Sequence, residues 1–487
     1  MKILILSPAN KGIKNVVRDF MYGCWCSGRR IGGMQMPPLN LLYVATVLKE
    51  NGHNVELVDA GMDYASYEDV KKRARDFGAV VILSSTNSFK MDIESLKELK
   101  RLNPYIKTII FGSHPTFMSE YCLREDCVDI IVRREPEFII RDVVNALSRN
   151  EIWENVKGIG YKNNGKMVLN EFYPFIDDLD KLPIPDRSFL PKNIDYFNPV
   201  VKRMPYTTMQ TSRGCPARCN FCTVPAFFGK KIRCRSAKNV VKEIKMLCTM
   251  GYREIFFRDE TFTVYKKRNK EICEMLIKDR VDVTWICNAR IDMIDKNDVV
   301  LMKRAGCHMI KFGVESGNQN ILENINKGIT LEQTREAFKI CHEVGMDTHA
   351  HVMLGCPGES KETIKETINF IKEIDPTTAS FGIHTPYPGT ELFNRIALEY
   401  PEIKDGSDAS LEKLHIKGFF NESFTDLQKE ELEKYVRRAY RMFYFRLGYL
   451  FKRFLSINSF NELMRWAIAG SNIFGFGTEK SRNGKED

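Results

Sequence analysis

Three closely spaced cysteines constrain this chain more than any other feature of its sequence. Cys215, Cys219 and Cys222 lie in TSRGCPARCNFC with the spacing C-x3-C-x2-C. Three thiolates cannot all pair as disulfides with one another, but they can hold three corners of an iron–sulfur cluster, because thiolates are the usual ligands of such clusters. The fourth iron would then have no protein ligand, and an open metal position is typical of a catalyst rather than of a structural site.

Two other interpretations of this motif stay open, a structural zinc site and a chance group of buried thiols. Structural zinc prefers four ligands, often as two spaced pairs, but no second CxxC lies nearby and the next cysteine is Cys234. A chance group is possible in a chain with 14 cysteines. Gly214 and Pro216 break regular structure at the motif and favour a turn from a strand into a loop, which suits a ligand site.

Residues 1–148 read as strands that alternate with amphipathic helices. The runs KILILSP, NVELVDA, AVVILSS and TIIFGSH are apolar enough for buried strands, and helical patterns separate them. This alternation predicts an α/β fold with a Rossmann-like, doubly wound parallel sheet. Ligands of such sheets bind beyond the carboxyl ends of the strands. The loops at those ends are Pro8–Lys14, Ser84–Phe89 and Gly112–Thr116.

The rest of the chain divides into three further predicted parts. Residues 149–204 read as a proline-rich linker with a small β-hairpin around Asn163–Gly165. Residues 205–400 carry six strand candidates with helices between them, which predicts a partial (β/α)6 barrel whose catalytic loops follow the strands. Residues 401–487 are predicted to be a helical extension.

Length and composition narrow the class of protein. A chain of 487 residues is long enough for two or three domains. Its cysteines are scattered and its first residues do not read as a secretory signal, so we expect a reducing cytoplasm. No run of 18 apolar residues predicts a transmembrane helix. The net charge of +10 is compatible with phosphate-bearing cofactors, an anionic membrane or an ordinary charged surface.

At the cysteine motif the sequence resembles the radical S-adenosylmethionine (SAM) superfamily. The resemblance extends to the segments GVESG, PGES and PYPGT, which follow in the same order, and covers about residues 1–400. It implies that Cys215, Cys219 and Cys222 bind a 4Fe–4S cluster. It also implies that the amino and carboxylate groups of SAM chelate the open iron.

The resemblance also implies a set of SAM contacts at the carboxyl ends of the barrel strands. These are Phe221, Asp259, Glu260, Arg290, Glu315, Ser316 and Gly317. An acid would face the SAM ammonium, Arg290 its carboxylate, and Glu315 the ribose hydroxyls. Alternatives remain for three of them: Asp259 could cap a helix, Arg290 could form a structural ion pair, and Phe221 could pack in the core rather than against adenine.

The first half of the chain resembles the cobalamin-binding domain that precedes many radical SAM domains. The implied cobalamin contacts are Pro8, Ser84, Ser85, Thr86, Gly112, His114 and Pro115. Cobalamin domains that place histidine below cobalt carry D-x-H-x-x-G after the first strand, but this chain has SPANKGIKN there. Binding without a histidine ligand is therefore expected. A Rossmann-like domain that carries no cobalamin is the alternative.

The two resemblances together imply a cobalamin-dependent radical SAM enzyme. It would cleave SAM to a 5′-deoxyadenosyl radical under anaerobic conditions and then methylate a hydrophobic small molecule from methylcobalamin. The anaerobic magnesium-protoporphyrin ester cyclase shares this architecture, so oxidative cyclisation or a rearrangement of a porphyrin-like or lipid substrate is an alternative. A non-catalytic corrinoid-binding protein is another. We expect a flavodoxin or ferredoxin as electron donor and no nucleic-acid partner.

The C-terminal helices carry an unusual mixture of basic and aromatic residues. The run RRAYRMFYFRLGYLFKRF spans residues 437–454 and reads as amphipathic. Cationic helices with aromatic faces can lie in a membrane interface. They can equally cover the open side of the barrel, with arginine stems packed on apolar surface. The sequence is compatible with both arrangements.

Overall fold

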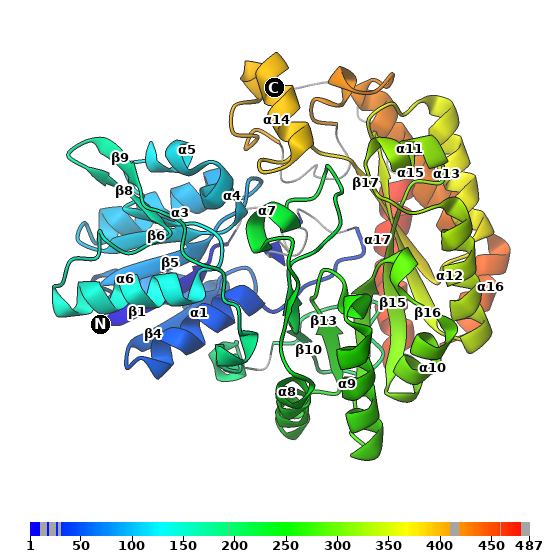
Figure 1. Ribbon diagram of the computed structural model, residues 1–487, viewed down its shortest axis with the longest axis horizontal. Helices are drawn as coiled ribbons and strands as arrows, with labels where there is room; N and C mark the ends of the chain where they lie inside the picture. The colour runs from blue at the N-terminus through cyan, green and yellow to red at the C-terminus, as the bar shows by residue number, and fades with distance from the viewer. Residues whose placement is uncertain are drawn as a thin grey trace.

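The computed structural model describes residues 1–9, 31–192, 194–409, 418–457 and 459–478, together with the backbone of two short strands, β2 (Val17–Arg18) and β3 (Cys26–Ser27). Residues 10–14 of the predicted loop after the first strand lie outside this description. Figure 1 shows two sheets on opposite sides of a central region, with the chain passing from the blue and cyan sheet to the green and yellow one.

The first sheet is doubly wound, as predicted. Its strand order is β4-β1-β5-β6-β7-β8-β9, and the first five strands in this order are parallel. They are β1 (Lys2–Ser7), β4 (Asn54–Asp59), β5 (Ala79–Leu83), β6 (Lys107–Phe111) and β7 (Ile130–Val132). From β1 the chain adds β4 on one side of the sheet and then β5 on the other side, so the switch point lies between β1 and β5. Ligands of open α/β sheets bind at such a switch point.

Helices cover both faces of this sheet because successive strand residues point in opposite directions. Ile3 and Ile5 pack toward α1 (Leu39–Glu50) and α6 (Glu137–Arg149). Leu4 and Leu6 belong to the core on the other face. That face is covered by α2 (Tyr64–Lys72), α3 (Phe89–Leu102) and α5 (Ser119–Leu123), while α4 (Ser113–Phe117) follows β6.

The predicted hairpin joins the first sheet and does not lie in a separate linker. Strands β8 (Ile159–Asn163) and β9 (Lys166–Leu169) are antiparallel, and β8 pairs with β7. Ile159 is fully buried, and Tyr161 is nearly so. Without the hairpin β7 would be an open edge strand, which proteins usually cover. The sheet therefore extends well beyond the predicted boundary at residue 148.

The second sheet confirms the predicted partial barrel. Its six strands are all parallel and follow one another in chain order. They are β10 (Tyr206–Met209), β13 (Glu254–Phe257), β14 (Thr284–Ala289), β15 (Cys307–Glu315), β16 (Asp347–Leu354) and β17 (Thr378–Ile383). The helices that follow the strands are α8 (Ala237–Thr249), α9 (Lys266–Lys278), α10 (Lys296–Arg304), α11 (Gln319–Asn324), α12 (Leu331–Val344), α13 (Lys361–Glu373) and α14 (Glu391–Glu399).

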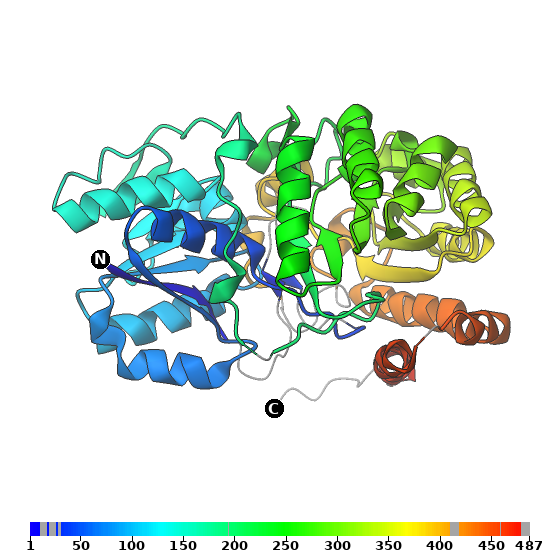
Figure 2. The ribbon, with the colours of Figure 1, turned by 90° about the horizontal axis from the view of Figure 1, so that it is seen from below.

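Three C-terminal helices cover the β17 edge of this sheet. They are α15 (Lys429–Tyr444), α16 (Leu447–Leu455) and α17 (Phe460–Thr478), and Figure 2 shows α15 in orange and α17 in red beneath the strands. The hydroxyls of Tyr440, Tyr444 and Tyr449 hydrogen-bond to backbone groups of residues 377–381. The barrel edge is thus closed by side chains in place of another strand.

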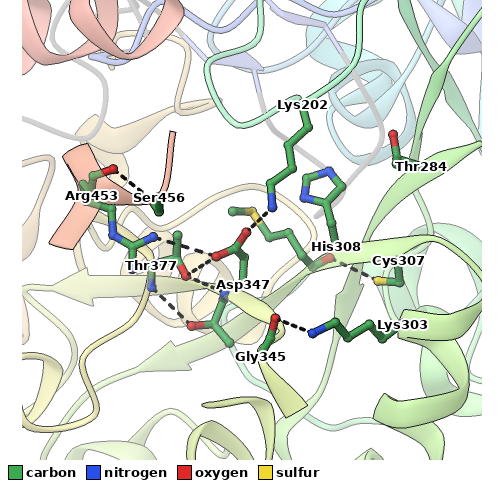
Figure 3. Close-up of polar contacts among 12 residues, drawn as sticks. Lys202, Thr284, Lys303, Cys307, His308, Gly345, Asp347, Thr377, Arg453 and Ser456 are labelled. Atoms are coloured by element: carbon green, nitrogen blue, oxygen red, sulfur yellow. Dashed lines mark hydrogen bonds and ion pairs between the residues drawn. The ribbon is translucent and has the colours of Figure 1, made fainter. Parts of the chain in front are cut away.

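A charged cluster fastens α16 to the amino-terminal end of the strands. Asp347, the first residue of β16, lies 2.6 Å from Lys202 Nζ and accepts a hydrogen bond from Thr377, while Arg453 Nη1 is 3.8 Å away (Figure 3). Burial alone would raise the pKa of Asp347, but Lys202 and Arg453 outweigh it and the pKa is lowered. The cluster joins the segment before β10, the sheet and the C-terminal helices.

None of the described helices combines the length and the hydropathy that a transmembrane segment needs.

The tyrosine contacts to β17 predict a measurable loss of stability when one hydroxyl is removed. Tyr444 donates to the Ala379 carbonyl at 2.6 Å and accepts from the Ala379 amide at 3.0 Å. Tyr444→Phe leaves two buried backbone groups without a partner, so we expect the free energy of unfolding to fall by about 1–3 kcal/mol. Urea denaturation measures it, and Tyr265→Phe, at an exposed position, is the control that should change little.

Candidate functional site

One large cavity of about 840 Å³ lies inside the second sheet and contains most of the predicted site. Cys215, Cys219 and Cys222 line one part of it. The inward-facing residues of β14 to β17 form its floor, and aromatic side chains of α15, α16 and α17 close it on the other side. The predicted cysteines, strand-end residues and C-terminal helices therefore meet at one place.

The cysteine loop is held at its base by a two-stranded ribbon. Strands β11 (Ser212–Arg213) and β12 (Arg233–Cys234) are antiparallel, and the segment between them carries the cysteines and α7 (Val224–Phe228). Gly214 has φ +94°, and a methyl group there would collide with the Lys231 carbonyl. Asn220 fixes the far side of the loop, since its amide donates to the Asn324 carbonyl at 2.7 Å.

Two cations lie beside the cysteine thiols. Arg290 Nη1 is 3.9 Å from Cys219 Sγ, and Lys327 is also close enough for a Coulomb interaction with Cys219. Burial raises the pKa of the Cys215 thiol above its ordinary value. Nearby cations favour thiolates and any anionic group that thiolates hold. Within the described segments, no three Cys, His, Asp or Glu side chains converge so as to bind a single ion.

The two acids after β13 occupy different environments. Glu260 lines the cavity. Asp259 does not: it is fully buried and accepts hydrogen bonds from the Thr211 amide at 2.6 Å and from the Ser212 hydroxyl at 2.6 Å. It also caps no helix. Its contacts fix the strand that leads into the cysteine loop, so they support a positioning role for Asp259 rather than a contact with SAM.

Arg290 has features of both interpretations that the sequence left open. It forms an ion pair with Asp292 at 2.9 Å and donates to the Lys327 carbonyl at 3.1 Å. Its remaining terminal nitrogen points toward Cys219, and the residue lines the cavity. The ion pair therefore orients the guanidinium without removing it from the cavity.

Glu315 lies at the end of β15 in a strained backbone conformation with φ +65°. Its carboxylate is 2.7 Å from Lys327 Nζ, and both residues are buried and line the cavity. Gly313 makes room for this pair, because a methyl group there would collide with both groups. Ser316 and Gly317 lie outside the cavity and bond to Thr367 of α13, which fixes the turn after Glu315.

Phe221 and His384 both line the cavity and are in contact with each other. Their rings are 5.8 Å apart in an edge-to-face arrangement. His384 is buried, and its Nε2 has no hydrogen-bond partner among the described residues. Burial lowers the pKa of His384 to about 4. Asn198 Nδ2, also in the cavity lining, is likewise buried without a described partner. Such groups are expected where a polar ligand completes the site.

A polar strip on the cavity floor was not predicted from the sequence. His349 and His351 of β16 lie with ring centroids 4.5 Å apart, and the Ser380 hydroxyl of β17 bonds to both at 3.0–3.1 Å. Lys311 of β15 lies on the same floor, 4.9 Å above the Phe256 ring. The signal was the alternation of THAHVM, in which every second residue faces the barrel interior.

The predicted cobalamin residues lie at the carboxyl ends of β1, β5 and β6, at the switch point of the first sheet. Gly112 has φ +130°, and a methyl group there would collide with the Ser84 carbonyl. Ser84 is fully buried, and its hydroxyl has no partner among the described residues. Ser85 bonds within its own turn to Ser88 at 3.3 Å. Pro8 follows β1, and Pro115 is buried in α4.

His114 is engaged by protein groups on both ring nitrogens. Nδ1 is 3.2 Å from the Thr86 hydroxyl and Nε2 is 3.1 Å from Asp405 Oδ2. The ring is fully buried and packs on Phe89 at 4.5 Å. These contacts join the first sheet to the segment after α14. They support a positioning role for Thr86 and His114 rather than a direct contact with a ligand.

Two acids of the first half of the chain form ion pairs with the ribbon at the base of the cysteine loop. Glu135 and Glu137 follow β7 and are almost completely buried. Glu135 pairs with Arg233 of β12 at 2.8 Å and with Arg213 of β11 at 3.1 Å, and Glu137 pairs with Arg213 as well. Both strands of the ribbon are thus tied to the first sheet, which links its loops to the position of the cysteines.

The PGES segment contains a buried acid with an unusual pKa. Glu359 accepts hydrogen bonds from the Gly355 and Cys356 amides after β16, and burial raises its pKa to about 8. The folded state therefore retains a proton that the unfolded state loses above about pH 4.5. Stability should fall by about 3–5 kcal/mol as the pH rises from 4.5 to 8. Urea titrations should show that Glu359→Gln removes most of this slope, whereas exposed Glu399→Gln retains it.

Comparison with known proteins agrees with both halves of this arrangement. Residues 209–371 match the model of the radical SAM superfamily, and residues 32–144 match the model of the B12 binding domain. An uncharacterized methyltransferase of Pyrococcus horikoshii is 32% identical over 96% of this chain and 98% of its own length. The anaerobic magnesium-protoporphyrin IX monomethyl ester cyclase of Rubrivivax gelatinosus is 31% identical over 76% of this chain and 68% of its own length.

Solved structures share the fold across both domains. The radical SAM methyltransferase TsrM of Kitasatospora setae, with cobalamin and a [4Fe-4S] cluster bound, has a TM-score of 0.66 at 18% identity and covers 82% of this chain and 78% of its own. The cobalamin-dependent radical SAM enzyme OxsB, with aqua-cobalamin bound, has a TM-score of 0.69 at 16% identity and covers 98% and 71%. The chain therefore belongs to the radical SAM superfamily, among the enzymes in which a B12-binding domain precedes the radical SAM domain.

Proposed function

We propose that this enzyme modifies an unactivated carbon of a hydrophobic small molecule, with methyl transfer as the leading reaction. Enzymes of this family use a 4Fe–4S cluster, SAM and cobalamin. The observation that carries the proposal is the single cavity that holds the three cysteines, a polar floor and an aromatic wall. An enclosed, mostly apolar cavity with a few directed polar groups is the usual form of a small-molecule site.

We assign Cys215, Cys219 and Cys222 as the cluster ligands. Three thiols on one loop of a cavity, with Arg290 and Lys327 beside them, suit an anionic cluster that leaves one iron open to the cavity. The ribbon β11–β12 and Gly214 keep the loop in place independently of the thiols. Arg290, oriented by Asp292, would then neutralise charge near Cys219 and face the carboxylate of SAM.

The remaining SAM contacts are proposed from the groups that reach the cavity. Glu260 would face the ammonium group and Glu315 the ribose hydroxyls. Phe221 would lie against the adenine ring. Nε2 of His384, which has no partner among the described residues, would hydrogen-bond to the edge of that ring. Asp259, Ser316 and Gly317 would position these groups through the neighbouring backbone rather than touch SAM.

We propose the cobalamin site at the switch point of the first sheet. The buried hydroxyl of Ser84, which has no partner among the described residues, suits a polar ligand. Gly112 allows the loop after β6 to lie against the Ser84 carbonyl. Pro8, Ser85 and Pro115 would flank it. Thr86 and His114 would support the loop, and because both His114 nitrogens are engaged, the proposal includes no histidine bond to cobalt.

The cluster, SAM and cobalamin supply chemistry that amino-acid side chains lack. When bound, the cluster and SAM provide a 5′-deoxyadenosyl radical, and cobalamin provides a transferable methyl group. The protein orients the substrate and excludes water. Tyr440, Tyr444 and Tyr449 close the cavity, while His349, His351 and Ser380 present hydrogen-bonding groups to the substrate and can hold or pass a proton beside its reacting carbon.

Oxidative cyclisation or another radical rearrangement is the second candidate, because one relative of 31% identity is named as a ring-forming cyclase. A porphyrin-like or lipid substrate would suit it. Either reaction needs a low-potential electron donor such as a flavodoxin or ferredoxin. The cytoplasm, with contact between the C-terminal helices and a membrane surface, is the proposed location, and the basic, aromatic sequence of residues 437–454 supports it.

The test is anaerobic incubation of the reconstituted enzyme with reductant, methyl-labelled SAM and an extract of the host. Methyl transfer predicts label in a hydrophobic product together with 5′-deoxyadenosine. Release of 5′-deoxyadenosine without transferred label would favour cyclisation or rearrangement. An intact cluster that yields no 5′-deoxyadenosine would contradict both reactions and indicate a corrinoid-binding protein without catalysis.

A further inference from the structure

Helix α16 presents its apolar side to solvent. Leu447, Leu450, Phe451, Phe454 and Leu455 are each more than half exposed. Their spacing of three and four residues places them on one stripe of the helix. The opposite side faces the barrel, where Tyr449 bonds to β17 and Arg453 lies near Asp347. The helix therefore packs on the protein through Tyr449 and Arg453 and leaves its apolar side mostly exposed.

Helix α17 continues the same apolar surface. Phe460, Met464 and Ile468 are exposed and lie about one turn apart, and Phe474, six residues further along the helix, is exposed as well. Nine of the 19 large apolar residues that are exposed among the described segments fall within residues 447–474. A monomeric protein rarely exposes a concentrated apolar surface without a binding partner. We call this surface the α16–α17 face.

The helices that form this face are strongly basic in sequence. From Lys434 to Thr478 the sequence has eight Lys or Arg residues and one acid, Glu462, which is buried. Arg438 and Arg441 are exposed on α15, which packs against α17. Lys452 of α16 is also exposed, and it pairs with Asp375 at 2.9 Å. Figure 2 shows α15 and α17 together on one side of the molecule. A basic rim around aromatic and aliphatic residues matches the headgroups and acyl chains of an anionic bilayer.

The cavity reaches this face. Leu450, Phe454 and Phe474 line the cavity and are also 51%, 67% and 59% exposed, so the cavity has a mouth between α16 and α17. Trp466 and Ile473 line the cavity behind them. An apolar molecule could pass from the face to the cavity floor along apolar side chains.

We propose that the α16–α17 face docks on an anionic lipid bilayer and opens the cavity to it, so that the substrate enters from the lipid phase. The docking extends the membrane contact proposed above and does not depend on the reaction, whereas entry of the substrate from the lipid phase rests on the proposed reaction. A second copy of the chain fits the face poorly. A two-fold dimer pairs a surface with itself, and this would bring the basic residues of the two copies together.

Flotation with vesicles tests the docking. We expect the reconstituted protein to float with vesicles of phosphatidylcholine and phosphatidylglycerol, and far less with phosphatidylcholine alone. Phe451→Glu combined with Leu455→Glu should lower the partition coefficient at least about tenfold. Neither residue lines the cavity, so SAM cleavage should be unchanged. Tyr105→Glu combined with Leu398→Glu, at two exposed positions elsewhere, is the matched control and should float like the wild type.

Three outcomes would overturn the docking: no flotation of the wild type, an equal loss in the control variant, or a dimer in light scattering that the Phe451/Leu455 variant abolishes. The direction of the mouth is tested with vesicles that carry doxyl-labelled lipid. The doxyl groups should quench part of the tryptophan fluorescence of the wild type, and this part should be missing in Trp466→Phe. Equal quenching in the wild type and in Trp466→Phe would contradict a mouth that faces lipid. Failure of SAM cleavage in a protein that still floats would instead refute the proposed function.

Discussion

Cys219→Ala is expected to abolish reductive cleavage of SAM and to leave the fold of residues 1–148 intact. The residue lines the cavity beside Arg290, whereas the loop is fixed by the β11–β12 ribbon, Gly214 and Asn220. Loss of the thiol therefore removes a ligand without removing the support of the loop. We expect 5′-deoxyadenosine formation to fall at least about 100-fold, the upper range for loss of a group that supports a metal site.

The chain offers a matched control for this experiment. Cys234 is partly buried like Cys219 but lies in β12 and does not line the cavity. Cys234→Ala should keep its iron and its SAM cleavage. Both variants are reconstituted anaerobically, assayed for 5′-deoxyadenosine by mass spectrometry and compared by circular dichroism. Cleavage by Cys219→Ala at the wild-type rate would refute the ligand assignment.

Arg213→Met is expected to have the largest effect on stability. Arg213 is 2% exposed and pairs with Glu135 and Glu137, which are equally buried. Its removal leaves the Glu137 carboxylate buried without its cation, and breaking such a pair typically costs about 3–5 kcal/mol. Because the ribbon beneath the cysteine loop loses its tie to the first sheet, we also expect less iron per chain after reconstitution.

Urea denaturation measures the loss of stability, and two further variants make the test specific. Arg203→Met breaks an exposed pair with Asp282 at 2.7 Å and should cost only about 0–1 kcal/mol. Arg213→Met combined with Glu137→Gln removes the stranded charge and should recover part of the stability. An effect of Arg213→Met no larger than that of Arg203→Met would show that the buried network does not hold the two sheets together.

The strands of both sheets could be predicted because buried parallel strands are short apolar runs between helical patterns. Runs such as AVVIL and EIFF can be predicted as strands without knowing which strands they pair with. The hairpin at 159–169 was also visible, but its partner was not, because pairing with β7 depends on which edge of the first sheet is open. The predicted boundary at residue 148 therefore came before the actual end of that sheet.

Within the site, local motifs located the residues but not the direction of their side chains. Asp259 and Glu260 are neighbours, yet only Glu260 reaches the cavity, because successive residues point to opposite sides of a strand end. His114 lies in a predicted loop, but Asp405 from far along the chain occupies one of its nitrogens. Such long-range contacts leave no local signal in the sequence.

The polar floor and the cover were missed for a similar reason. His349 and His351 resemble any alternating strand until β17 brings Ser380 beside them. The aromatic run of the C-terminal helices suggested either a membrane or the barrel. The structure supports an arrangement that uses both sides: tyrosines of α15 and α16 close the edge of β17, while the apolar stripe of α16 faces outward.

In the proposed site, three cysteines hold a cluster whose remaining iron is open to SAM. The most direct measurement is electron–nuclear double resonance on the anaerobically reconstituted and reduced protein, with SAM labelled by 15N at its amino group. We expect about four irons per chain and a hyperfine coupling from the labelled nitrogen that is lost without SAM. Absence of iron, or a protein donor that keeps the fourth position when SAM is present, would contradict it.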